Sequence, residues 1–199
     1  MHVGPHGMPG DGVLIGGAGT GFSQPHEHRR VELGRDIVSA AYIRGDFVLS
    51  SGGRSSYYFD KYLFETKPTI LRRLASFLAE MVPSGIDRLA GPELGAVALV
   101  TALSLETGIP FVIVRKGSKG YGTSRLVEGE LHEGERLLIV EDVISTGSEA
   151  LNAATKVRQA GADVRGILAV IDREQGGAEN IAAAGFRMEA LYRLSDLPV

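Results

Sequence analysis

The chain of 199 residues is long enough to bury a hydrophobic core without covalent cross-links, and its length fits one domain. It contains no cysteine, which excludes disulfides, thiolate metal sites and thiol nucleophiles, and this composition fits a reducing cytoplasm. The formal net charge of −3 gives no electrostatic reason to expect nucleic-acid binding, and no apolar run approaches the roughly 20 residues of a membrane-spanning helix.

Residues 1–30 differ from the rest of the chain in composition. They are rich in glycine and hold three of the eight prolines and four of the five histidines, without helical periodicity. This composition predicts a flexible N-terminal extension, followed by a single domain over residues 31–199. The glycine-rich residues 16–21 invite comparison with a nucleotide-binding loop, but no Lys-Ser/Thr pair follows them, which argues against that function.

The first part of the expected domain combines helices with a hairpin. Apolar residues recur every three to four positions from Val31, which predicts a helix that ends near Gly45. Residues 46–60 predict two short strands around a Gly-Gly turn, and residues 68–82 predict a second amphipathic helix.

From residue 89 onward, short apolar runs alternate with helical patterns. The expected strands are residues 89–91, 111–114, 137–140, 166–171 and 186–194, and the expected helices between them are residues 96–107, 150–160 and 178–184. This alternation predicts an α/β fold with a mainly parallel sheet flanked by helices, in which ligands bind at the carboxyl ends of the strands. At those ends stand Pro92 and Glu93, Arg115 and Lys116, Glu141 and Asp142, and Asp172 and Arg173.

Residues 135–150 carry the most specific pattern in the chain. A buried strand is followed at once by the carboxylates of Glu141 and Asp142, then by a turn of small hydroxyl residues, then by a helix. The turn offers backbone N–H groups and hydroxyls at the positive end of a helix, which suits a phosphate. Carboxylates repel a phosphate, but they accept hydrogen bonds from sugar hydroxyls or bind a hydrated magnesium ion. The stretch predicts a site for a phosphorylated ribose; the alternative is an ordinary strand-to-helix turn with a Ser/Thr cap.

Residues 115–130 predict a long mobile loop, because they hold four glycines and no apolar periodicity. The loop carries Arg115, Lys116, Lys119 and Arg125 beside the expected phosphate site. Cations that close over a departing pyrophosphate stabilise the charge that develops in the transition state, and a closed loop excludes water. The alternative is a basic loop that is merely solvated.

The strand, acidic pair and Ser-Thr-Gly turn at residues 137–147 resemble the 5-phosphoribosyl 1-pyrophosphate (PRPP) motif of the type I phosphoribosyltransferases. The sequence Arg-Lys-x-x-Lys-x-Tyr-Gly-Thr, which starts at Arg115, resembles the loop of the orotate phosphoribosyltransferases in particular. Three further segments similar to that family are residues 47–60, 91–96 and 171–177. The resemblance covers about residues 31–197. It implies the type I phosphoribosyltransferase fold, with a small hood formed by the N-terminal and C-terminal segments.

The resemblance implies an enzyme that transfers ribose 5-phosphate from PRPP to orotate, giving orotidine 5′-monophosphate and pyrophosphate in pyrimidine (UMP) biosynthesis. It also implies the use of Mg2+, with no protein side chain assigned as a direct ligand of the ion. The family resemblance further implies a homodimer in which loop 115–130 of one subunit reaches the neighbouring site.

Carried over residue by residue, the resemblance makes Lys119 the catalytic lysine on the pyrophosphate and places Glu141 and Asp142 on the ribose hydroxyls. It pairs Arg173 with the orotate carboxylate, for which a guanidinium group has matching geometry. The residues that it assigns to PRPP are Arg115, Lys116, Lys119, Tyr121, Glu141, Asp142, Val143, Ile144, Ser145, Thr146, Gly147, Ser148 and Glu149. The residues that it assigns to orotate are Ser145, Arg173, Tyr58 and Phe59.

Two features depart from the family pattern. Tyr121 stands where many bacterial members have a histidine that contacts pyrophosphate. Ser50 stands where some members place a lysine on PRPP, and no lysine follows Pro92. Arg54 and Lys61 are the candidates to supply the missing positive charge.

Simpler roles and other functions stay open. Arg173 could form a structural ion pair with Glu174, and Tyr58 and Phe59 could be core residues. The alternative functions are transfer to another base on the same scaffold, and a PRPP-sensing regulator that binds nucleic acid. A panel of orotate, uracil, adenine, hypoxanthine and xanthine tests the first, and a gel shift tests the second.

Overall fold

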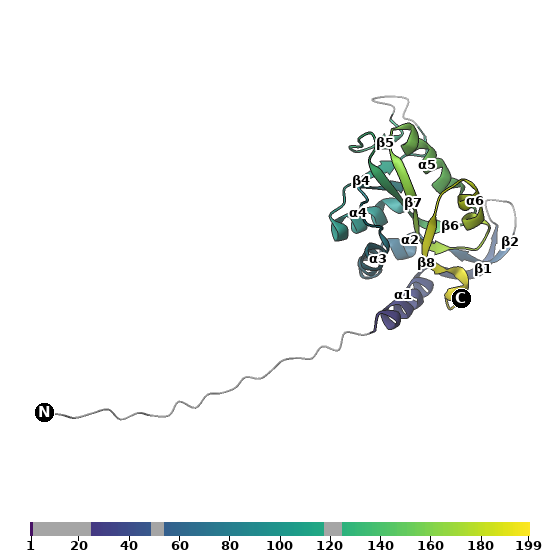
Figure 1. Cartoon of the computed structure of the whole chain (residues 1–199). Coiled ribbons are helices and arrows are strands. Elements are labelled where there is room, and N and C mark those ends of the chain that lie inside the picture. Colours follow the sequence, from purple (N-terminus) through teal and green to yellow (C-terminus); the bar gives the residue numbers. More distant parts are fainter. Residues whose placement is uncertain (2–24, 49–53, 118–124) are drawn as a thin grey trace.

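The computed structural model describes Met1 and residues 25–48, 54–117 and 125–199 (Figure 1). Within these residues, six strands form the main sheet in the order β5-β4-β3-β6-β7-β8. Every neighbouring pair is parallel except β4 with β5, which confirms the mainly parallel sheet. The strands are β3 (Arg88–Pro92), β4 (Phe111–Val114), β5 (Val127–Glu128), β6 (Arg136–Ile144), β7 (Asp163–Asp172) and β8 (Met188–Arg193).

Helices cover both faces of this sheet, as the alternating pattern predicts. On one face pack α1 (His26–Ala41), α2 (Tyr62–Glu65), α3 (Pro68–Met81) and α4 (Ala96–Thr107), and on the other α5 (Ser148–Gln159) and α6 (Gly177–Ala183). Strand β6 serves both layers: Leu138 and Val140 join the first core, whereas Leu137 and Ile139 join the second. The reason is that successive side chains of a strand point to opposite faces.

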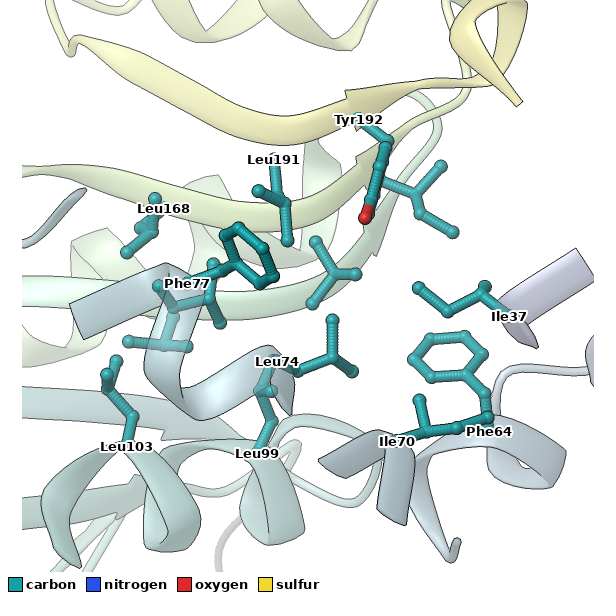
Figure 2. Packing of buried hydrophobic residues seen from close by; sticks show 14 of the residues in the cluster. Ile37, Phe64, Ile70, Leu74, Phe77, Leu99, Leu103, Leu168, Leu191 and Tyr192 are labelled. Atoms are coloured by element: carbon teal, nitrogen blue, oxygen red, sulfur yellow. The ribbon is translucent and has the colours of Figure 1, made fainter. Parts of the chain in front are cut away.

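The larger core lies between the sheet and helices α1 to α4 (Figure 2). Ile37 of α1, Phe64 of α2 and Leu74 of α3 are fully buried there. Burying each such side chain stabilises the fold by roughly 1.5–3 kcal/mol relative to leaving it exposed. This gain explains why the apolar spacing over residues 68–82 forms a helix over nearly the same range.

The N-terminal helix packs against the C-terminal part of the chain, as expected for the hood. The hydroxyl of Tyr192 donates to the carbonyl oxygen of Arg30 at 2.7 Å, and the guanidinium of Arg30 donates to that of Leu191 at 2.8 Å. Helix α1 begins at His26, before the predicted start at Val31, so the last residues of the predicted flexible extension are helical. These contacts with β8 hold them in place. The rest of that extension, except Met1 and Pro25, lies outside the described residues.

The predicted hairpin is present as a separate two-stranded antiparallel sheet of β1 (Tyr42–Val48) and β2 (Arg54–Phe59). The strand β1 begins earlier than predicted, so the preceding helix ends at Ala41 rather than near Gly45. The Gly-Gly turn itself lies outside the described residues.

Two short elements were not predicted, and strands β3, β6 and β7 are longer than predicted. Helix α2 has four residues, and β5 has two residues inside the segment that the sequence analysis assigned wholly to a loop over 115–130. Strand β6 continues through the acidic pair to Ile144, whereas the apolar run predicted only residues 137–140. A 3-10 turn at Leu194–Asp196 follows β8. None of the described helices has the length and apolar character needed to cross a membrane.

Candidate active site

The predicted phosphate turn lies at the carboxyl end of β6, where the chain passes into α5. Gly147 adopts a left-handed conformation with φ 78° immediately before the helix. A Cβ atom there would lie 3.0 Å from Ile181 and 3.1 Å from the carbonyl oxygen of Gly177, so the turn also requires glycine for space. Asn180 of α6 supports the turn by donating from its side-chain amide to the carbonyl oxygen of Thr146 at 3.0 Å.

The first turn of α5 leaves its backbone donors available. No side chain within the described part of the chain caps this helix, although four N–H groups at a helix start lack an intrahelical partner. Beside the turn lies a cavity of about 380 Å³. Its lining residues are Glu141, Val143, Ile144, Ser145, Thr146, Gly147, Ser148, Glu149, Ala150, Arg173 and Gln175. The cavity therefore offers an anion site formed by helix N–H groups and hydroxyls.

The two carboxylates of β6 differ in their surroundings. Glu141 lines the cavity, and its Oε2 atom is buried without a hydrogen-bond partner among the described residues. Burial, followed by the negative charge of Asp142, raises the pKa of Glu141 well above its usual range. An unpartnered buried oxygen at a cavity wall is an acceptor that a ligand hydroxyl can satisfy.

Asp142 is completely buried and is held from two sides. Its Oδ1 accepts the N–H of Val143 at 2.5 Å, and its Oδ2 accepts the ammonium group of Lys61 at 2.6 Å. A Cβ atom on Gly95 would collide with the Asp142 carboxylate and the Lys61 ammonium group. Gly95 lies at the end of the loop after β3. The ion pair between Lys61 and Asp142 fits there only because Gly95 has no side chain. The structure thus brings Glu141 to the cavity but covers Asp142 with Lys61.

Of the two proposed substitutes for the missing lysine, Lys61 lies at the site and Arg54 pairs elsewhere. Lys61 approaches the loop after β3, which is the segment where the sequence lacks a lysine. Arg54 instead binds Asp46 across the exposed hairpin. A further acid, absent from the predicted site residues, is Glu65, which is buried four residues after Lys61. The spacing i, i+4 was the available signal, because it places two side chains on one face of a helix.

The basic residues at the start of the predicted loop lie beside acids in the described structure. Lys116 Nζ lies 2.9 Å from the Glu149 carboxylate, and Arg115 lies 3.6 Å from that of Glu128. The side chain of Lys156 on α5 donates to the carbonyl oxygens of Arg115 and Lys116, at 2.6 and 3.0 Å. The loop therefore starts from a fixed position beside the cavity. Lys119 and Tyr121 lie outside the described residues.

Arg173 lies where the sequence places the orotate-binding residue, in the wall of the same cavity as Ser145 and Glu141. Its Nε atom is buried and has no hydrogen-bond partner among the described residues. The alternative of an ion pair with Glu174 is wrong, because Glu174 accepts the N–H and the hydroxyl of Ser195 at 2.9 and 3.0 Å. A buried guanidinium N–H without an acceptor favours one, and an anionic ligand can supply it.

The two aromatic residues assigned to orotate point in different directions. Tyr58 is 45% exposed, whereas Phe59 is half-buried and its ring lies 6.0 Å from that of Phe64 in the core. Neighbours on a strand face opposite sides, so both cannot stack on one ligand from β2 without rearrangement. Neither residue lines the cavity beside Arg173.

A sequence model of the phosphoribosyl transferase domain matches residues 65–187, which include strands β3 to β7, the phosphate turn and Arg173. The chain thus has the domain of that class, and the expected type I phosphoribosyltransferase fold is confirmed. The solved orotate phosphoribosyltransferase of Mycobacterium tuberculosis in complex with Fe(III) dicitrate has a TM-score of 0.78 at 33% identity. That match covers 86% of this chain and 99% of the other.

Curated relatives define the family more narrowly. The orotate phosphoribosyltransferase of Methanocella arvoryzae is 45% identical over 153 residues, which are 77% of this chain and 87% of the relative. That of Pyrococcus horikoshii is 47% identical over 170 residues, covering 83% and 91%. The chain belongs to the orotate phosphoribosyltransferase family. An adenine phosphoribosyltransferase from Leishmania tarentolae, at 20% identity and a TM-score of 0.62, shares the fold alone; the two matched stretches cover 81% and 88% of the chains.

Proposed function

We propose that this protein transfers ribose 5-phosphate from PRPP to N1 of orotate, giving orotidine 5′-monophosphate and pyrophosphate in pyrimidine biosynthesis. The observation that carries the proposal is the composition of one cavity wall. It combines the N-terminus of α5 for a phosphate, the unpartnered oxygen of Glu141 for a sugar hydroxyl, and the unpartnered guanidinium donor of Arg173 for a carboxylate. Such a set complements a phosphorylated ribose beside an anionic base.

The comparisons support both substrates. The family relatives are orotate phosphoribosyltransferases, and a solved member from Mycobacterium tuberculosis was obtained in complex with PRPP. That structure has a TM-score of 0.74 and 31% identity, with 86% of this chain and 99% of the other covered.

The proposed mechanism requires no covalent bond between enzyme and sugar. The turn at residues 145–149 holds the 5′-phosphate, and Glu141, with Asp142 behind it, orients the ribose hydroxyls. Arg173 holds orotate so that N1 faces the anomeric carbon. Orotate already carries electron density at N1, so no strong general base is needed. Loop cations, with Lys119 foremost, stabilise the charge on the departing pyrophosphate as the sugar becomes oxocarbenium-like.

Magnesium is proposed to enter with PRPP rather than as a resident ion. No three or more of the described histidines, aspartates and glutamates are arranged so that they could hold a metal ion together. Mg2+ typically keeps several waters and binds substrate phosphates with one or two carboxylates. When bound, the ion would neutralise the pyrophosphate leaving group. Glu141 lies beside the phosphate turn, where it would hold the ribose hydroxyls of the PRPP that brings the ion.

The assembly and location are further parts of the proposal. A homodimer in which loop 115–130 serves the neighbouring site is inferred from the family resemblance. A reducing cytoplasm is supported by the absence of cysteine.

The direct test is orotate-dependent release of pyrophosphate from PRPP by the purified protein, with and without Mg2+. We expect release only when both orotate and Mg2+ are present. Release with uracil, adenine, hypoxanthine or xanthine in place of orotate would instead establish another base on the same scaffold. Binding of DNA or RNA in a gel shift, without any release, would favour the regulatory alternative.

Replacing Arg173 by alanine should raise the KM for orotate by about tenfold to a hundredfold, because a hydrogen bond to a charged group contributes roughly 1.5–3 kcal/mol. The KM for PRPP should change little, since the phosphate turn is untouched. Steady-state kinetics with each substrate varied in turn measures both constants. Arg72→Ala, on the exposed side of α3, is the matched control and should leave both unchanged. An unchanged KM for orotate in the Arg173 variant would show that Arg173 does not bind the orotate carboxylate.

A further inference from the structure

Helix α2 was not predicted from the sequence. A charged side chain stands at each of its two ends, on the side of the acidic pair of β6. Lys61 precedes the helix and Glu65 is its last residue. The side chain of Lys61 is 28% exposed, whereas Glu65 is only 2% exposed. Phe64, between them, anchors the helix in the larger core. The burial of Phe64 therefore fixes the position of the helix and of the charged residues at its two ends.

The cluster contains more acids than its single base can neutralise. Glu65, Glu141 and Asp142 are all buried, and Lys61 is the cation that pairs with Asp142 among them. Burying uncompensated carboxylates costs several kcal/mol each, so a carboxyl in this setting keeps its proton. Burial, together with the negative charge of Asp142 and a hydrogen bond with it, raises the pKa of Glu65 to about 9, and Lys61 opposes this only partly.

A protonated Glu65 is a hydrogen-bond donor, not a second anion. Its Oε1 atom is buried and has no partner within the described residues, and its hydrogen bond with Asp142 is one cause of the raised pKa. The carboxylate of Asp142 accepts the N–H of Val143 and the ammonium group of Lys61, and a protonated Glu65 would be its third donor. Asp142 is then the shared acceptor of the cluster.

We propose that Lys61 and Glu65 are positioning residues that donate to Asp142 from the two ends of α2. Through Asp142 they hold the preceding residue on β6: the N–H of Asp142 donates to Glu141 Oε1 at 3.3 Å, which leaves Glu141 Oε2 without a partner at the cavity. The inference deepens the proposed function and rests on it, since the ligand so served is the ribose of PRPP.

The test uses variants that separate donation from charge and from packing. Glu65→Gln keeps a neutral donor of the same size, whereas Glu65→Leu keeps the volume and removes the donor. We expect Glu65→Gln to retain PRPP affinity within about twofold of the wild type. Glu65→Leu should lose about tenfold in PRPP affinity, as for one hydrogen bond to a charged group, with the KM for orotate unchanged. Its melting temperature should not fall, because an unpartnered buried oxygen is removed.

Lys61 is tested in the same way. Lys61→Met should weaken PRPP binding by about tenfold or more, and the double variant with Glu65→Leu should lose less than the product of the two single effects. Such non-additivity is expected because both residues act through Asp142. Lys67→Met, an exposed lysine just after α2, is the matched control.

Calorimetric titration with PRPP and Mg2+, without orotate, measures these affinities directly. Wild-type PRPP affinity in Glu65→Leu, or equal losses in Glu65→Gln and Glu65→Leu, would overturn the inference. Should Glu65→Leu fail to fold, a large loss of PRPP affinity in the folded Glu65→Gln protein would overturn it, and retention would support it. If the wild type binds PRPP but releases no pyrophosphate with orotate, the proposed base is wrong, and the binding data still judge Lys61 and Glu65.

Discussion

Replacing Lys119 by alanine is expected to lower turnover by about a hundredfold or more while leaving the melting temperature unchanged. The physical reason is that the reaction moves negative charge onto the departing pyrophosphate, and a cation placed there acts mainly on the transition state. Its loss should therefore appear in kcat more than in the KM for PRPP. The expected independence from stability follows from the loop base, where the N–H of Arg115 donates to the carbonyl oxygen of Leu126 at 2.8 Å.

The measurement is steady-state turnover with saturating orotate and PRPP, together with thermal unfolding of both proteins. Lys67→Ala removes an exposed lysine far from the proposed pyrophosphate position in sequence and is the matched control. Turnover within about threefold of the wild type, against the expected loss, would show that Lys119 is not the catalytic lysine. The transferase activity would then have to depend on Arg115, Lys116 or Lys61.

Gly147→Ala is expected to raise the KM for PRPP by about tenfold or more. Two effects combine in this variant. A non-glycine residue at φ 78° is strained by about 1–2 kcal/mol, and its Cβ atom would press on Ile181 and on the carbonyl oxygen of Gly177. The turn can relieve this pressure only by moving the N–H groups that start α5. Those N–H groups are the proposed donors to the 5′-phosphate, so affinity falls together with stability.

Gly108→Ala separates strain from binding. Gly108 ends α4 with φ 72°, but no atom lies within 4 Å of the position its Cβ would occupy. The backbone strain is thus similar, and the phosphate turn is untouched. Both variants should lose unfolding free energy through strain, Gly147→Ala more because of its close contacts, and only Gly147→Ala should lose PRPP affinity. Equal KM values for PRPP in the two variants would show that the turn at Gly147 does not bind the 5′-phosphate.

The sequence was sufficient for the elements that carry a long enough pattern. The apolar run at residues 137–140 and the periodicity over 68–82 predicted β6 and α3, because burial of those side chains dominates local free energy. Helix α2 spans about one turn, too short to show a period, and β5 exists through its pairing with β4. Neither element could be read from local composition, since tertiary contacts create both.

The candidate site shows the same division. The phosphate turn and Arg173 follow from motif and position, because the carboxyl ends of parallel strands meet at one edge. The burial of Asp142 beneath Lys61 could not be predicted, because it depends on the bare backbone of Gly95 and on the placement of α2. Glu65 escaped notice for a related reason: an acid after Phe64 suggests an exposed residue until its neighbours are known.

The pairing of β4 with β5 has a consequence for engineering. Ile113 lies opposite Glu128 and Val114 opposite Val127, so the chain leaves the sheet and returns to it at adjacent rungs of one ladder. The two ends of the segment between Val114 and Val127 are already joined by the scaffold, where the N–H of Arg115 donates to the carbonyl oxygen of Leu126. A two-residue Asn-Gly link in its place should yield a protein that folds and melts like the parent yet transfers nothing, a ready-made background onto which loops from other transferases can be transplanted.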